Sequence, residues 1–169
     1  MKKKAEVKVS VVMGSDSDLP ILKETMTVLK EFDIPFETVL TSAHRSPERT
    51  LKLIRTFENQ GAEVFIAVAG KAAHLAGVVA SHTVRPVIGV PVESGGLGGL
   101  DALLSTVQMP KGIPVATMGT GKTGAANAAL LALEILGLKK AAFRKKLGEF
   151  RKKMAGQVEA DSEKVQKNL

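Results

Sequence analysis

The chain has 169 residues, a mass of 17.8 kDa and a formal net charge of +7. This length suits one domain with a substantial core, and 44% hydrophobic with 24% charged residues is usual for a globular protein. The absence of cysteine excludes disulfides and thiolate metal sites, and no apolar run approaches the ~20 residues of a membrane span. Because the start does not resemble a signal peptide, we predict a cytoplasmic protein.

The positive charge is concentrated at the two ends of the chain. Residues 139–169 carry a net charge of +6 and residues 1–8 one of +3, which leaves −2 for the remainder. Basic runs of this kind are usually solvated faces, and Trp and Tyr, which stack on unpaired bases, are absent. Nucleic acid is therefore not an expected partner.

Along most of the chain, the spacing of the hydrophobic residues alternates between that typical of a strand and that typical of a helix. Strands are expected at 7–13, 36–41, 62–69, 86–91 and 113–118. Helices are expected at 19–32, 47–60, over the small residues from Ala72 to Gly77, and at 100–107 and 123–136. The alternation predicts an α/β fold with a parallel, doubly wound sheet of five strands and helices on both faces.

The last part of the chain predicts an extended C-terminal helix from residue 139 to about 165. Its apolar residues recur every three or four positions: Phe143, Leu147, Phe150, Met154 and Val158. This stripe needs a partner, either its own domain or a neighbouring subunit. We therefore predict a domain at 1–138 and a basic helical extension at 139–169 that packs on a neighbouring subunit of a homo-oligomer.

The turn Gly14–Asp18 follows the first strand and is rich in small and oxygen-bearing residues. Glycine allows close backbone approach, and Ser15, Ser17 and Asp18 stand at the start of a helix with free N–H groups nearby, which suits a phosphate. The alternative is simple N-capping of the helix by Ser17 or Asp18.

The turn Ser42-Ala43-His44-Arg45 follows the second strand. It places an imidazole, which can give and take a proton near neutral pH, beside a guanidinium suited to phosphate or carboxylate. The alternative is an ordinary helix-start turn with a solvated arginine. In open α/β sheets such turns line the crevice beyond the carboxyl ends of the strands, where ligands bind.

Two other patterns predict chemistry less well. Residues 116–123 match a relaxed phosphate-loop pattern, but Ala116 replaces the first glycine and no later strand supplies a magnesium-binding aspartate. His74 and His82 stand eight residues apart, too far along a helix for one metal ion, so no metal site is expected. His82 is expected to be a terminal polar residue, whereas His74 either faces the same crevice as His44 or packs in the core.

Six segments in this order closely resemble the PurE family of purine biosynthesis over about residues 7–137. They are Gly14–Asp18, Ser42–Arg45, Gly70–Leu75, Gln108–Pro110, Gly112–Val115 and Gly124–Ala128. The resemblance implies a flavodoxin-like, three-layer fold, a homo-octamer whose C-terminal helix reaches a neighbour, and no metal or organic cofactor. The ligand would be an aminoimidazole ribonucleotide.

The family has two branches. One is a mutase that moves the carboxylate of N5-carboxyaminoimidazole ribonucleotide from N5 to C4, by decarboxylation and recarboxylation, and the other carboxylates aminoimidazole ribonucleotide directly with CO₂. The forms Ala43-His44-Arg45 and Ala72-Ala73-His74-Leu75 are similar to the mutase branch. Lys71, where mutases commonly have glycine, and Ala76, where proline is frequent, depart from it.

The resemblance implies a catalytic His44 that acts as general acid and base. The implied substrate-binding residues are Gly14, Ser15, Ser17, Asp18, Ser42, Arg45, Gly70, Lys71, Ala72, His74 and Leu75. Turns at 94–99 and 109–110 are expected to wall the site. A separate ATP-dependent synthetase would supply the mutase substrate. The alternatives are direct CO₂-dependent carboxylation and a non-catalytic nucleotide-binding protein of the same fold.

Overall fold

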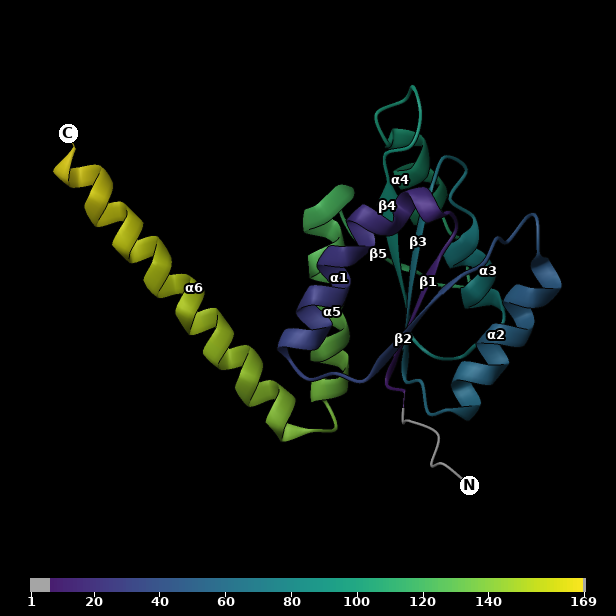
Figure 1. The fold of residues 1–169 in the computed structure, drawn as a ribbon, viewed down its shortest axis with the longest axis horizontal. Helices are drawn as coiled ribbons and strands as arrows, with labels where there is room; N and C mark the ends of the chain where they lie inside the picture. The colour runs from purple at the N-terminus through teal and green to yellow at the C-terminus, as the bar shows by residue number, and fades with distance from the viewer. Residues whose placement is uncertain (1–6, 169) are drawn as a thin grey trace. The chain divides into compact units, whose positions relative to one another are not determined.

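The structure is a computed structural model that describes residues 7–168. Five strands form one parallel sheet in the order β2-β1-β3-β4-β5 (Figure 1). The strands are β1 (Val9–Met13), β2 (Phe36–Leu40), β3 (Val64–Gly70), β4 (Val87–Val92) and β5 (Ala116–Thr117). This order is the flavodoxin-like form of a doubly wound sheet, so the predicted α/β fold is confirmed.

Helices connect the strands and continue beyond the last one. They are α1 (Leu19–Glu31), α2 (Pro47–Asn59), α3 (Leu75–Ser81), α4 (Leu100–Val107), α5 (Gly121–Gly137) and α6 (Ala141–Lys167), with a short 3-10 turn, η1 (Asp16–Asp18), before α1. None of the helices between residues 7 and 168 combines the length and the apolar character needed to span a bilayer.

The chain divides into two compact units, Met1–Ala132 and Leu133–Leu169. The first holds the whole sheet, with α1 and the first part of α5 on one face and α2, α3 and α4 on the other (Figure 1). The hydroxyl of Thr25 in α1 donates a 2.8 Å hydrogen bond to the carbonyl oxygen of Ala125 in α5, which ties these two helices together. The sequence predicts a domain boundary between residues 138 and 139, and this boundary stays a prediction.

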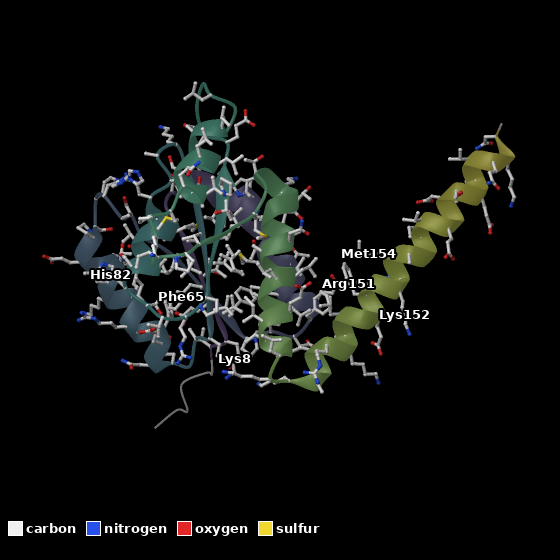
Figure 2. All side chains as sticks on the ribbon, turned by 180° about the vertical axis from the view of Figure 1, so that it is seen from behind. Lys8, Phe65, His82, Arg151, Lys152 and Met154 are labelled. Carbon is white, nitrogen blue, oxygen red and sulfur yellow. The ribbon has the colours of Figure 1, made fainter. Side chains whose placement is uncertain are left out.

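The core lies on both sides of β1 and β3. Both strands are almost continuously buried, as expected for central parallel strands, and Phe65 on β3 is among the largest side chains with no exposed surface (Figure 2). At the start of β1 the ammonium of Lys8 lies 2.9 Å from the carboxylate of Glu63, which orders the entry to both strands.

Two elements begin more than two residues away from the sequence prediction. The third helix begins at Leu75 rather than Ala72, because Lys71 has φ +55° and the amide of Ala73 bonds the carbonyl oxygen of Gly70 in a turn. The fifth strand pairs only over Ala116–Thr117, since Pro114 has no N–H to give the sheet.

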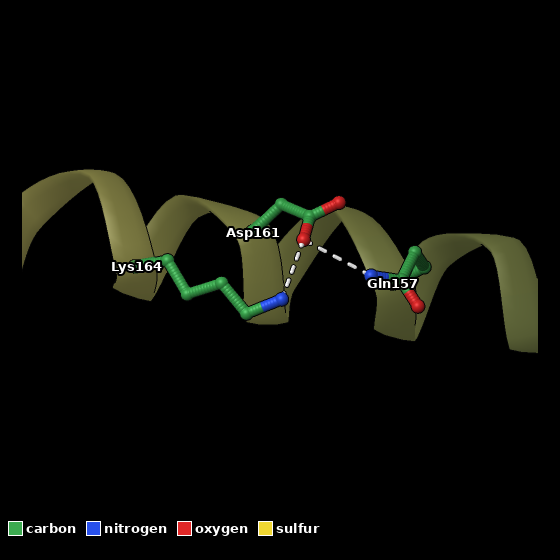
Figure 3. A network of polar contacts seen from close by, with 3 residues as sticks. All are labelled: Gln157, Asp161 and Lys164. Carbon is green, nitrogen blue, oxygen red and sulfur yellow. Dashed lines mark hydrogen bonds and ion pairs between the residues drawn. The ribbon is translucent and has the colours of Figure 1, made fainter.

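The second unit contains the end of α5 and the long basic helix α6. The guanidinium of Arg144 donates a 2.6 Å hydrogen bond to the carbonyl oxygen of Gly137, and Arg151 pairs with Glu134. No residue of α6 within Ala141–Lys167 is buried. In the predicted apolar stripe, Met154 (labelled in Figure 2) and Val158 are exposed. Further along, the carboxylate of Asp161 accepts hydrogen bonds from Gln157 and Lys164 (Figure 3).

Gly89 on β4 allows α3 and α4 to lie close to the sheet. A Cβ atom there would stand 2.4 Å from Cγ2 of Thr106 and 3.0 Å from Cγ1 of Val115. We predict that Gly89→Ala lowers the free energy of unfolding by about 1–3 kcal/mol, the usual cost of overpacking. The matched control is Gly14→Ala, where the added Cβ makes contacts of 3.7–3.8 Å and stability should hold. Equal denaturation midpoints for the two variants would contradict this account of the packing.

Candidate functional site

Three turns at the carboxyl edge of the sheet enclose one cavity of about 750 Å³. Because parallel strands end at the same edge, residues from β1, β2 and β3 that are far apart in sequence meet there. Every site residue predicted from the sequence lines this cavity: Gly14, Ser15, Ser17, Asp18, Ser42, His44, Arg45, Gly70, Lys71, Ala72, His74 and Leu75. The structure therefore brings the predicted set together, while the role of each residue stays a prediction.

The turn after β1 satisfies much of its own hydrogen bonding. Ser15 and Asp18 form a capping box, in which the amide of Ser15 donates to the carboxylate of Asp18 over 3.1 Å. The amide of Ser17 donates to Oγ of Ser15 and to the carboxylate of Asp16. The expectation of free N–H groups thus fails at residues 15 and 17. The hydroxyls of Ser15 and Ser17 also form hydrogen bonds within the turn, to Asp16 and to Ser15 respectively.

Asp18 is a buried carboxyl at the base of the cavity, with 2% of its surface exposed. Burial raises the pKa of Asp18, and the nearby charge of Asp16 adds to this, while hydrogen bonds from Ser15 and Ser17 act in the opposite direction. A carboxylate held in this way is a good acceptor for hydroxyl groups of a ligand, because each added hydrogen bond offsets the cost of burying the charge.

The turn after β2 is fixed by its serines. The amide of Ser46 donates to the carbonyl oxygen of Ser42 over 2.9 Å, and the amide of Arg45 donates to Oγ of Ser42 over 3.1 Å. Below them the hydroxyls of Thr41 and Thr50 share a buried 2.8 Å hydrogen bond. The backbone that carries His44 and Arg45 is therefore held while both side chains stay exposed.

His44 and His74 meet across the cavity from different strand ends. Nε2 of His44 lies 2.7 Å from Nδ1 of His74, and the two rings stand at 86° to one another. One of these nitrogens carries the shared proton and the other accepts it, so two N–H groups cannot face each other there. Nδ1 of His44 is left as the nitrogen that can exchange a proton with a ligand. Of the two alternatives for His74, the structure shows the one in which it faces the cavity, because His74 is exposed and lines it.

The turn after β3 combines a close backbone approach with an unusual lysine. A Cβ atom on Gly70 would stand 1.8 Å from Oγ of Ser94 and 2.9 Å from the carbonyl oxygen of Val92, so Gly70 has no room for a side chain. Lys71 follows with φ +55°, a conformation that favours glycine, and its exposed side chain lines the cavity.

Only one residue of the two turns predicted to wall the site, 94–99 and 109–110, lies at the cavity. Ser94 reaches the cavity beside Gly70, whereas the rest of the turn 95–99 and residues 109–110 do not line it. Met109 instead packs near Gly77 of α3, with Sδ 3.2 Å from the position of an added Cβ. Ser94 was expected as part of a wall and was missed as a site residue, because its approach to Gly70 depends on the β3–β4 pairing.

The other sequence patterns lie elsewhere. His82, labelled in Figure 2, lies after α3. It lines a separate cavity of about 960 Å³ at the amino edge of the sheet, with Glu58 and Arg85. Residues 116–123 run from β5 into α5, where Lys122 pairs with Glu24 at 3.8 Å and the carbonyl oxygen of Gly119 lies against Gly124. Within residues 7–168 no three His, Asp or Glu side chains are grouped as they would be around a metal ion.

The strand order and the position of the cavity define a doubly wound α/β protein with a polar cavity at the switch point between β1 and β3, where proteins of this class bind their ligands. A family model described as AIR carboxylase matches residues 8–157, and the chain belongs to this family.

Relatives of this length are similar over nearly the whole chain. The N5-carboxyaminoimidazole ribonucleotide mutase of Pyrococcus horikoshii is 52% identical over 94% of this chain and 88% of its own length. The protein of the same name from Methanocaldococcus jannaschii is 54% identical over 93% and 96%. The crystal structure of Treponema denticola PurE matches with a TM-score of 0.85 and 27% identity, covering 92% of this chain and 96% of that one.

The raised pKa of Asp18 predicts how stability changes with pH. The folded protein disfavours the ionised carboxyl, so the contribution of Asp18 to stability is greatest in acid and is lost as the pH rises through its raised pKa. An amide at this position still accepts from the amide of Ser15 and carries no charge. We therefore expect Asp18→Asn to be at least as stable as the wild type at neutral pH, and less stable relative to it in acid. Urea titrations at several pH values test this. A difference in the free energy of unfolding between the two proteins that does not change with pH would contradict it.

Proposed function

We propose that the chain is an N5-carboxyaminoimidazole ribonucleotide mutase, an isomerase of purine biosynthesis. The observation that carries this proposal is the pair His44–His74 in a cavity that also holds Arg45 and the Ser15–Asp18 turn. Relatives about half identical over most of the chain carry the mutase name, which supports this branch over direct carboxylation.

The ribose phosphate is proposed to bind between Arg45 and the turn after β1. The guanidinium of Arg45 has no hydrogen-bond or ion-pair partner among the described residues, and the hydroxyls of Ser15 and Ser17 lie across the same cavity. A planar guanidinium binds phosphate oxygens in pairs, and hydroxyls adapt to the remaining ones. Asp18 then accepts hydrogen bonds from the ribose hydroxyls.

The reaction needs one proton delivered to the exocyclic nitrogen N5 and a different proton removed from ring carbon C4. Protonation of the exocyclic nitrogen by His44 breaks its bond to the carboxylate and releases CO₂. The ring carbon C4 then attacks CO₂, and His44 removes the C4 proton as the ring regains its aromatic character. His44 ends in its starting state, so one imidazole serves as acid and then as base with no net proton change.

His74 is proposed to position His44. Its Nδ1 lies 2.7 Å from Nε2 of His44, so it fixes the ring and sets which nitrogen carries the shared proton. While His44 holds the extra proton, neutral His74 accepts a hydrogen bond from it and stabilises the charge. Proton exchange is thereby directed to the other side of the His44 ring.

The CO₂ formed in the first step must stay near C4, which requires a closed cavity. His44 and His74 are exposed within a single chain, so further cover is needed. We propose that it comes from assembly into a homo-octamer, in which the C-terminal extension packs on a neighbour. The exposed Leu97, Leu100, Leu104 and Val107 offer an apolar surface for such assembly.

The proposal also assigns a metabolic context. Formation of a carbamate on nitrogen requires an activated carboxyl group. An ATP-dependent synthetase would therefore supply the substrate. The proposed reaction uses no metal or organic cofactor, since His44 carries both proton transfers. We place the enzyme in the cytoplasm with the other steps of nucleotide synthesis.

Turnover by the purified protein tests the function. We expect efficient formation of 4-carboxy-5-aminoimidazole ribonucleotide from N5-carboxyaminoimidazole ribonucleotide, and little from aminoimidazole ribonucleotide at low bicarbonate. The reverse preference would assign the protein to the carboxylase branch. Binding of these ribonucleotides without turnover would favour a non-catalytic nucleotide-binding protein.

Substitutions at the histidine pair test the mechanism. His44→Asn should lower kcat by about 10²–10⁴-fold, the usual worth of a general acid and base. His74→Phe removes the partner of His44 and should lower kcat with little change in KM, whereas His74→Asn places a polar group near the former Nδ1 and should keep more activity. An active His44→Asn protein would remove His44 from the mechanism, and equal activity of the two His74 variants would remove the positioning role.

A further inference from the structure

Lys71 has a backbone conformation that its residue type does not favour. Among the described residues other than glycine, Lys71 and Asp33 have a positive φ, and both have φ +55°. Asp33 follows the end of α1, where helices commonly finish with a left-handed residue and aspartate is tolerated. Lys71 instead follows a strand, and its side chain is too long to stabilise the turn as aspartate or asparagine does. Strained residues of this kind gather at ligand sites.

The cavity has an excess of positive charge that the protein does not neutralise. Arg45 and Lys71 are the arginine and lysine that line it, and neither has an ion-pair partner among the residues the structure describes. The cavity's acidic residue, Asp18, is buried and already accepts hydrogen bonds from Ser15 and Ser17. Two unpaired cations in one cavity suit a ligand with two anionic groups.

The two cations come from opposite sides of the switch point. In the strand order β2-β1-β3, Arg45 follows β2 and Lys71 follows β3, with the turn of Ser15 and Ser17 between them after β1. Two strand spacings amount to about 10 Å. A ribonucleotide that carries a phosphate at one end and a carboxylate on its base at the other spans a similar length.

We propose that the ammonium group of Lys71 binds the carboxylate that the enzyme transfers. This inference rests on the proposed function, because it assumes that the phosphate is bound by Arg45 and the turn after β1. Lys71 then makes the site select carboxylated ribonucleotides over the decarboxylated one. It also lies three residues before His74 on the same turn, so it holds the carboxylate beside the histidine pair where the carboxylate is released and added back.

Binding by two ligands that differ only in the carboxylate tests this role. The ligands are 4-carboxy-5-aminoimidazole ribonucleotide and aminoimidazole ribonucleotide, titrated calorimetrically into the full-length protein. Lys71→Gly removes the charge and suits the positive φ, while Lys71→Gln removes the charge and keeps the strained residue type. Lys52→Gln is the matched control, since Lys52 is an exposed lysine on α2 outside the cavity.

We expect both Lys71 variants to bind the carboxylated ligand about ten-fold or more weakly, as for the loss of a charge-assisted hydrogen bond. Their affinity for aminoimidazole ribonucleotide should stay within about two-fold of the wild type on the same basis, and Lys52→Gln should change neither affinity. Equal loss for both ligands would assign Lys71 to the phosphate and overturn the inference, as would no loss for either. A wild-type protein that binds neither ribonucleotide would instead overturn the proposed function itself.

Discussion

The hydrogen bond between Nε2 of His44 and Nδ1 of His74 is the contact on which the site depends. It joins turns that follow β2 and β3, which are separated in the sheet by β1, so it spans the end of β1. Each histidine is exposed, and its position is set by the turn that carries it rather than by burial in the core. The chemistry proposed here therefore depends on how accurately the sheet holds three strand ends together.

That accuracy comes from close packing beneath the turns. Gly70 lies against Ser94 and Val92 with no space for a side chain, which fixes the end of β3 to the end of β4. On the other side, the paired hydroxyls of Thr41 and Thr50 and the serine hydrogen bonds around Ser42 hold the end of β2. A rigid frame carries the exposed imidazoles, which is how a loop site can keep catalytic geometry.

Charge is distributed in a way that separates the site from the rest of the surface. The lysine-rich helix α6 accounts for much of the net positive charge, yet the cavity has its own two unpaired cations in Arg45 and Lys71. The buried carboxyl of Asp18, whose pKa is raised, sits between them in the middle turn. Anionic and hydroxyl groups of one ligand can thus be recognised at different points along a single row of turns.

The sequence by itself determined the order of strands and helices and the three turns that carry chemistry, because period-two and period-3.6 patterns and glycine-rich breaks are local properties. It also identified His44, Arg45 and Lys71 as candidates. The tertiary structure alone decided that His74 faces His44, that Ser94 belongs to the cavity, and that the amides of Ser15 and Ser17 are occupied. These facts depend on strand pairing and on turn geometry at distances of a few ångströms, which no pattern along one chain specifies.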